Sequence, residues 1–250
     1  MVKQKVIFRD LGLMQYQAVW DFQEKLLQEN LKKKSEARSL GSESAISNKE
    51  EIQSLLTTTH YLLFTEHHPV YTLGKSGNKE NVLLPAEELK KRGIEFFHTN
   101  RGGDITFHGP GQVVVYPILD IEKFYTDIGK YLRNLEETII RTMAEYGLVG
   151  DRSPGETGVW IDPAIPAKAR KVCAIGVRCS RWITMHGFAF NVNTDLSYFN
   201  HIIPCGISNK QVTSLQKELG HVVDVHEVKE KIKKNFEIVF ESELASEVFF

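Results

Sequence analysis

The side chain best suited to chemistry in this sequence is a thiol in the segment IIPCGI. Cys205 lies between Pro204 and Gly206, which favour a turn, and it follows a short helix-like segment, DLSYFNHI. A thiol on a turn is more accessible than one inside a regular element, and an accessible thiolate is a strong nucleophile. The other cysteines, Cys173 and Cys179, lie in or beside the strand-like run KVCAIGVRC, where we expect them to be buried.

Metal and nucleotide sites are not predicted. Three cysteines without a C-x-x-C pair argue against a disulfide framework and against a thiolate zinc site. The histidines show no H-E-x-x-H spacing. The segment LGKSG resembles part of a phosphate-binding loop, but the glycine required five residues before Gly74 is replaced by Pro69. No G-x-G-x-x-G opens a helix, so we expect neither a metal nor a nucleotide cofactor.

The densest cluster of unusual residues is RGGDITFHGPGQ, residues 101–112. Two glycine turns bracket Thr106, Phe107 and His108, and an arginine stands at the start. Glycine adopts backbone conformations closed to other residues and lets a ligand approach the main chain closely. The segment is therefore interpreted as a binding loop rather than a plain connection.

The elements that must position these residues are strands and helices in mixed order. Runs with strand-like composition and stretches with apolar residues three and four positions apart are both present. We predict strands at 2–8, 60–66, 69–74, 94–99, 112–118, 157–161, 171–177 and 186–192, and helices from Gln15 to Leu31 and at 85–92, 128–146 and 225–240. Gly93 and Gly147 are predicted to follow the ends of the second and third helices. Because the order is not a strict βαβ alternation, the predicted fold class is α/β or α+β, a mixed sheet with flanking helices on one face.

Length and composition suit one globular domain over residues 1–250, or a domain with a small appendage. The chain has 31 Lys+Arg against 32 Asp+Glu and a net charge of -1, so no overall field favours nucleic acid or a membrane surface. No apolar run approaches the length of a membrane span, and the first residues do not resemble a signal peptide, so we expect a cytoplasmic protein. Residues 32–50 are poor in apolar side chains, and we predict a solvated polar insertion or an extended helix end there.

Several separated blocks of the sequence resemble one family. The blocks EHHPVYTLG, RGGDITFHGPGQVVVYP, GVWID, KVCAIGVR, RWITMHGFAFNVNTDLSYFNHIIPCGI and VTSL, in this order from about residue 60 to 215, are similar to the octanoyltransferases of lipoate biosynthesis. The resemblance implies the fold of the lipoate and biotin protein ligase catalytic domain. It also implies transfer of an octanoyl group from acyl carrier protein to a lysine of a lipoyl domain, the first step of endogenous lipoate biosynthesis. The implied acceptors are the lipoyl domains of 2-oxoacid dehydrogenase E2 subunits and the glycine cleavage H protein.

The resemblance also assigns roles to particular residues. It implies that Cys205 is the nucleophile that carries the acyl group as a thioester, and that Lys171 lowers the pKa of this thiol and is a candidate acid or base. The acyl-binding residues that it implies are Arg101, Gly102, Gly103, Asp104, Ile105, Thr106, Phe107, His108, Ala174, Ile175, Gly176, Gly187, Phe188 and Ala189. A thioester donor is already activated, so this chemistry needs no cofactor.

Three other functions remain open at this level. An ATP-dependent lipoate protein ligase of the same fold would not need Cys205, and formation of an adenylate would identify it. A non-catalytic protein that binds lipoyl domains would tolerate replacement of the cysteine. A cysteine hydrolase would release the free acid to water.

Overall fold

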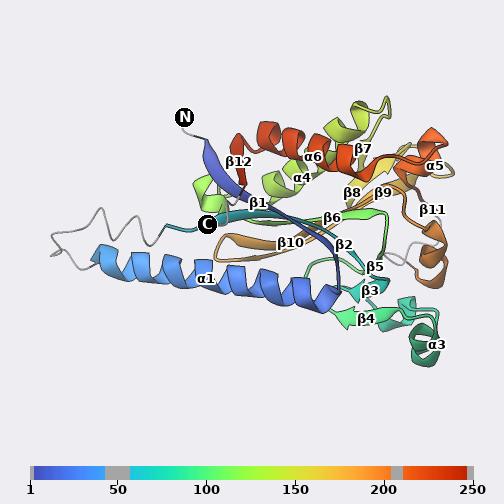
Figure 1. Cartoon of the computed structure of the whole chain (residues 1–250), viewed down its shortest axis with the longest axis horizontal. Helices are drawn as coiled ribbons and strands as arrows, with labels where there is room; N and C mark the ends of the chain where they lie inside the picture. Colours follow the sequence, from blue (N-terminus) through green and yellow to red (C-terminus); the bar gives the residue numbers. More distant parts are fainter. Residues whose placement is uncertain (1–2, 43–56, 204–210, 247–250) are drawn as a thin grey trace.

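The computed structural model describes residues 3–42, 57–203 and 211–246, and two sheets with helices around them form its framework (Figure 1). None of the helices in these residues combines the length and the apolar character needed to cross a membrane.

Within the described residues, nine strands form the larger sheet, in the order β12-β1-β2-β6-β10-β9-β8-β7, with β11 added beside β9. Their bounds are β1 Gln4–Met14, β2 His60–His67, β6 Gln112–Ile118, β7 Asp151–Ser153, β8 Glu156–Ile161, β9 Arg170–Ser180, β10 Ile183–Asn191, β11 Gln211–Val212 and β12 Ser242–Ser246. Strand β1 is parallel to both neighbours and β11 is parallel to β9, whereas the pairs from β2 to β7 are antiparallel. The sheet is mixed, as the sequence predicts.

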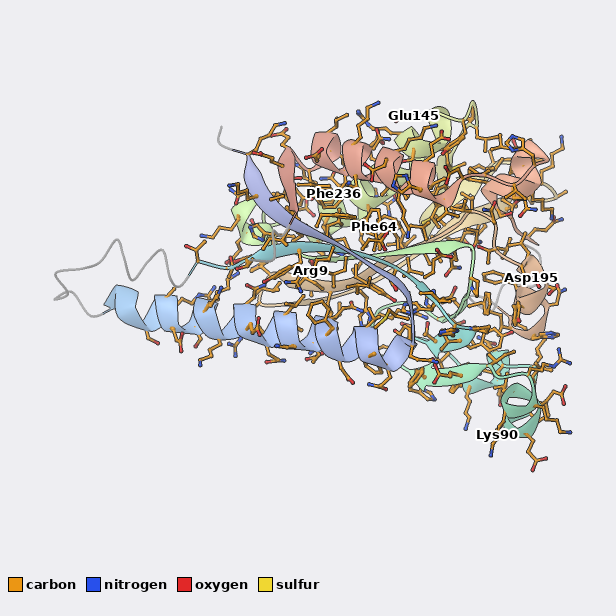
Figure 2. All side chains as sticks on the ribbon, viewed as in Figure 1. Arg9, Phe64, Lys90, Glu145, Asp195 and Phe236 are labelled. Carbon is orange, nitrogen blue, oxygen red and sulfur yellow. The ribbon has the colours of Figure 1, made fainter. Side chains whose placement is uncertain are left out.

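Helices cover both faces of this sheet, so the expectation of helices on one face is wrong. The three long helices are α1 Tyr16–Ser42, α4 Ile128–Ala144 and α6 Val225–Val239, and α1 lies on the opposite face from α4 and α6 (Figure 1). Along β6, Val113 and Val115 pack toward α4 and α6, whereas Val114 packs toward α1. Figure 2 shows Phe64 of β2 and Phe236 of α6, which belong to the α4 and α6 core. The run QVVVYPI is buried at every position because both sides of β6 are covered.

A second, smaller sheet lies beside the N-terminal end of α1, in the order β4-β3-β5 (Figure 1). Its strands are β3 Val70–Leu73, β4 Glu95–His98 and β5 Ile105–His108, and the short helix α3 Ala86–Lys91 packs against it. The segment that was predicted as a binding loop therefore contains a strand, β5. The glycine turns before and after this strand connect it to its surroundings.

The predicted strands and helices are all present, and their ends follow local signals. Helix α4 begins after Asp127, whose carboxylate accepts the Lys130 backbone N–H at 3.0 Å. Gly147 and Gly93, predicted to follow helix ends, both have positive φ angles, 73° and 66°. One further short helix, α5 Leu215–Leu219, lies between β11 and α6.

Over its first part the polar segment 32–50 is an extension of helix α1, one of the two predicted forms, but one of its lysines is buried rather than solvated. Residues 32–42 continue helix α1, and Lys34 is buried, with its ammonium 2.6 Å from carboxylate oxygens of both Asp120 and Glu122. Composition is a poor guide here because the partners of this lysine come from a distant part of the chain. Residues 43–50 lie outside the described residues.

Candidate functional site

A pocket of about 530 Å³ lies on the α1 face of the larger sheet, between the sheet, the start of α1 and the segment that leads into β5. The structure brings most of the predicted site residues together in its wall. These are Arg101, Gly102, Gly103, Asp104, Ile105, Thr106, His108, Lys171, Ala174, Ile175, Gly176, Gly187, Phe188 and Ala189. Phe107 does not line the pocket, because its ring points into the core of the small sheet and stacks on Tyr198 at 4.4 Å. Cys205 lies outside the described residues.

The floor of the pocket is made of very small residues on two paired strands. Gly176 of β9 is opposite Gly187 of β10, and Ala174 is opposite Ala189. A Cβ atom at Gly187 would collide with the Val115 carbonyl of β6, so this position also requires glycine for strand pairing. At these four positions no side chain larger than a methyl group occupies the pocket, which leaves room for an acyl chain along a floor of glycine and alanine.

The segment from Arg101 to Asp104 forms one side of the pocket and is fixed by hydrogen bonds to both sheets. Gly102 donates its N–H to the Val177 carbonyl at 2.9 Å, and a Cβ at Gly176 would lie only 2.8 Å from the Gly102 carbonyl oxygen. The Arg101 guanidinium is buried and donates to the Thr72 hydroxyl at 2.9 Å. Arg101 therefore anchors this segment to β3, in addition to lining the pocket.

The aromatic and imidazole groups of the pocket are uncharged at neutral pH. Burial lowers the pKa of His108 well below its usual value and that of His186 to about 3. Burial raises the pKa of Tyr16 to about 12, and the Tyr16 ring is stacked 5.9 Å from the His108 ring. His108 is held between Gln112, 2.8 Å from Nδ1, and the Thr72 hydroxyl, 3.3 Å from Nε2. These rings therefore add hydrogen-bonding groups to the pocket wall but no charge of their own.

Sequence reasoning did not identify the residues that complete the pocket. Tyr16, Gln112, Tyr116, His186 and Asn191 all contribute to its lining. Gln112 and Asn191 are joined side chain to side chain at 2.8 Å. Polar residues at the ends of strongly apolar strands were the available signal, whereas Tyr16 is indistinguishable in sequence from the apolar stripe of α1. Among the described residues, no three His, Cys, Asp or Glu side chains are grouped as metal ligands would be.

Lys171 lies on the pocket wall where β9 is paired with β8 on one side and β11 on the other. It is opposite Trp160 of β8 and Val212 of β11, and its ammonium lies 4.6 Å from the centre of the Trp160 ring. The Lys171 carbonyl accepts the Thr213 N–H at 2.9 Å. Val212 and Phe199 also line the pocket, and they belong to the two described segments on either side of residues 204–210.

The other two thiols are in different surroundings. Cys173 is fully buried, as expected, and burial raises the pKa of its thiol well above the usual value. Cys179 is exposed, so the expectation that it is buried is wrong. It lies near the end of β9, where the strand passes into the turn at Arg181, and it is not part of the pocket lining.

Comparison with known proteins gives the same assignment over nearly the whole chain. Residues 15–237 match the family model of the lipoyl protein ligase A/B catalytic domain. The chain is 52% identical to an octanoyltransferase of Christiangramia forsetii, over 97% of this chain and 99% of that one. It is 54% identical to an octanoyltransferase of Flavobacterium johnsoniae, over 97% of this chain and the whole of that one.

Solved structures show the same fold at low sequence identity. A putative lipoate protein ligase of Thermoplasma acidophilum superimposes with a TM-score of 0.65 at 15% identity, covering 99% of this chain and 90% of that one. A crystal structure of lipoate-protein ligase A bound with ATP gives a TM-score of 0.63 at 16% identity, covering 100% and 90%. Family model, curated relatives and fold agree, and the chain therefore belongs to the lipoyl protein ligase A/B catalytic domain family and is one of its octanoyltransferases, an acyl-transferring enzyme.

Proposed function

We propose that this octanoyltransferase works in the cytoplasm through a thioester on Cys205, with Lys171 favouring the thiolate and the pocket holding the acyl chain. Octanoyl-acyl carrier protein is the donor. The acceptors are lysines of lipoyl domains in 2-oxoacid dehydrogenase E2 subunits and of the glycine cleavage H protein. The observation that carries this proposal is the place of Lys171, on the wall of the pocket and paired with the strand that follows residues 204–210.

The described residues on either side of residues 204–210 are fixed in the fold. Ile203 donates its N–H to the Asn81 carbonyl at 2.9 Å, and Val212 is paired with Lys171. Of the remaining thiols, Cys173 is buried in the opposite core and Cys179 does not line the pocket.

The first half-reaction transfers the acyl group between two sulfur atoms. The Cys205 thiolate attacks the thioester carbonyl of the donor, a new C–S bond forms, and the bond to the carrier sulfur breaks. The carrier leaves as a thiolate and becomes a thiol by taking a proton from the Lys171 ammonium, which leaves a neutral amine. A thiol with a pKa near 8.5 needs about 2 kcal/mol to become half ionised at pH 7. One ammonium at about 4 Å supplies up to roughly 4 kcal/mol at an effective dielectric constant of 20, so Lys171 alone is sufficient.

The second half-reaction transfers the acyl group to nitrogen. The acceptor lysine amine attacks the thioester carbonyl, loses a proton and becomes an amide, while the Cys205 thiolate leaves. The neutral Lys171 amine and the departing thiolate are the two groups available to take that proton. The acyl chain, buried along the glycine and alanine channel, contributes about 0.8 kcal/mol of binding free energy for each buried methylene.

The experiment compares Lys171→Ala with Lys168→Ala, an exposed lysine three residues earlier that does not line the pocket. Alkylation of the Cys205 peptide is measured against pH by mass spectrometry, and octanoyl transfer from acyl carrier protein to a purified lipoyl domain is measured without ATP. We expect Lys171→Ala to raise the pH midpoint of alkylation and to lower kcat, while Lys168→Ala changes neither.

Two results would count against the proposal. An alkylation profile that is unchanged by Lys171→Ala would remove this lysine from the mechanism. Octanoyl transfer that requires ATP and survives Cys205→Ala would instead indicate a ligase that works through an adenylate.

A further inference from the structure

A fully buried carboxylate, Glu136, connects helix α4 to the strand beside Lys171. Its Oε1 accepts the Gly158 backbone N–H at 3.0 Å. Its Oε2 is paired with the guanidinium groups of Arg133, at 2.9 Å, and of Arg152, at 3.1 Å. The Glu136 side chain is 0% exposed, and an ionised carboxylate is retained at such a position only when its oxygens are fully paired. The two arginines compensate its charge, and one oxygen remains directed at the backbone of β8.

Gly158 occupies a backbone conformation that other residues avoid. Its φ angle is 125°, and a Cβ atom there would lie 2.6 Å from the Cys173 carbonyl oxygen. The pairing of β8 with β9 changes register immediately afterwards, between Val159 and Trp160. Such an irregularity re-aims the side chains around it.

The side chain that packs against this irregular part of β8 is Lys171. A Cβ at Gly158 would lie 3.4 Å from Lys171 Cε, so the aliphatic part of the lysine passes over the glycine. The ammonium then lies over the ring of Trp160, two residues further along β8. The path of this flexible side chain is therefore set by residues 158–160, and the conformation of Gly158 is held from behind by Glu136.

We infer that Glu136 is a positioning residue of the transfer reaction, which acts through the Gly158 hydrogen bond to hold the Lys171 ammonium on the pocket wall. This inference rests on the role proposed above for Lys171. Glu136 itself belongs to α4, on the opposite side of β8 from the lysine stem, and it is not among the residues that line the pocket. It therefore affects the reaction only through the strand.

The test compares Glu136→Gln with Glu137→Gln. Both carboxylates pair with Arg152, but Glu137 is 32% exposed and pairs with Arg141 and Arg152 rather than with Gly158. A glutamine at 136 has one acceptor oxygen, so it cannot serve both the guanidinium groups and the Gly158 N–H. Alkylation of the Cys205 peptide against pH and steady-state octanoyl transfer are measured for both variants, with and without Lys171→Ala.

For Glu136→Gln we expect the alkylation midpoint to rise by roughly half to one pH unit. We expect kcat to fall about 10- to 100-fold while the KM for the donor changes much less. Glu137→Gln should resemble the wild type. In the Lys171→Ala background, Glu136→Gln should produce no further shift, because two residues that act as one unit are not additive.

The sign of the midpoint shift separates positioning from a simple charge effect. Removing a negative charge near a thiol lowers the thiol pKa, so a midpoint that falls, or does not move, overturns the inference. If Lys171→Ala shifts the midpoint and Glu136→Gln does not, the role of Lys171 stands and that of Glu136 fails. If neither Lys171→Ala nor Glu136→Gln shifts the alkylation midpoint, the proposed roles of both residues fail.

A measurement on the unmodified protein keeps the inference testable even when Glu136→Gln does not fold. Hydrogen exchange of the peptide 156–161 should show the Gly158 amide as strongly protected as the neighbouring strand amides. Free exchange of this amide in the folded wild type would show that Glu136 does not hold it, and would overturn the inference.

Discussion

Lys34→Met should destabilise the protein strongly, although the sequence places this lysine in a polar run. All three donors of its ammonium are used, by Asp120 and Glu122 at 2.6 Å each and by the Arg181 carbonyl at 2.9 Å. Asp120 is 1% exposed and keeps only neutral partners, such as the Thr58 hydroxyl at 3.1 Å, when the lysine is removed.

The magnitude follows from the charge that is left behind. Removing one partner of a buried ion pair costs about 3–5 kcal/mol, and the remaining hydrogen bonds to Asp120 favour the lower end. For a chain of this size, 3 kcal/mol corresponds to a decrease in Tm of roughly 6–12 °C. The matched control is Lys32→Met. Lys32 is 76% exposed and lies 4.0 Å from Glu36, so its removal should cost about 0.5 kcal/mol or less.

The free energy of unfolding is measured by urea denaturation, and Tm by calorimetry, for both variants. Octanoyl transfer at 25 °C should stay within about twofold of the wild type in Lys34→Met, because the network does not line the pocket. An equally small decrease in the free energy of unfolding for Lys34→Met and Lys32→Met would refute the reasoning, since that result would mean that both lysines are solvated.

Three further predictions concern burial and the pocket. Burial lowers the pKa of His67 to about 4, so the unfolded chain binds a proton below pH 6.5 that the folded chain does not. The free energy of unfolding should therefore be largest above pH 6.5 and should fall toward pH 5, by about 2 kcal/mol for His67 alone. A urea midpoint that does not change between pH 7 and pH 5 would contradict this prediction. Gly187→Ala should lower the free energy of unfolding by about 1–3 kcal/mol, because the added Cβ collides with β6. The control, Gly129→Ala in helix α4, should not lower it. Equal urea midpoints for the two variants would be evidence against this packing. Ala174→Leu should lower the ratio of kcat/KM for octanoyl over butanoyl donors about tenfold, as two buried methylenes are lost; an unchanged ratio would place the acyl chain elsewhere.

Periodicity in the sequence was enough to find the principal elements. The apolar stripes of α4 and α6 and the β-rich runs of β6, β9 and β10 are long and regular, and their ends carry glycine or capping residues. Strand β5 was missed because it has only four residues between glycine turns, so its local composition is that of a loop. Its strand conformation comes from pairing with β3, which is more than 30 residues earlier.

The site could be outlined from sequence only as far as its motifs reach. The glycine and alanine floor lies in two recognisable segments, which the sheet brings together by pairing β9 with β10. Residues whose partners are distant gave no local signal. Lys34 is neutralised by Asp120, 86 positions later, and Glu136 meets Gly158 only after α4 has packed against β8. Long-range pairing of this kind depends on the tertiary fold, which composition and period do not encode.

The acyl-enzyme is the most direct test of the thioester mechanism. The protein is mixed with octanoyl-acyl carrier protein without an acceptor, quenched in acid and digested, and the peptides that contain each cysteine are weighed. The mechanism predicts one octanoyl group on the Cys205 peptide, lost when a lipoyl domain is added and recovered on the lipoyl-domain lysine. An octanoyl group found only on Cys173 or Cys179, or transfer at the wild-type rate by Cys205→Ala, would contradict it.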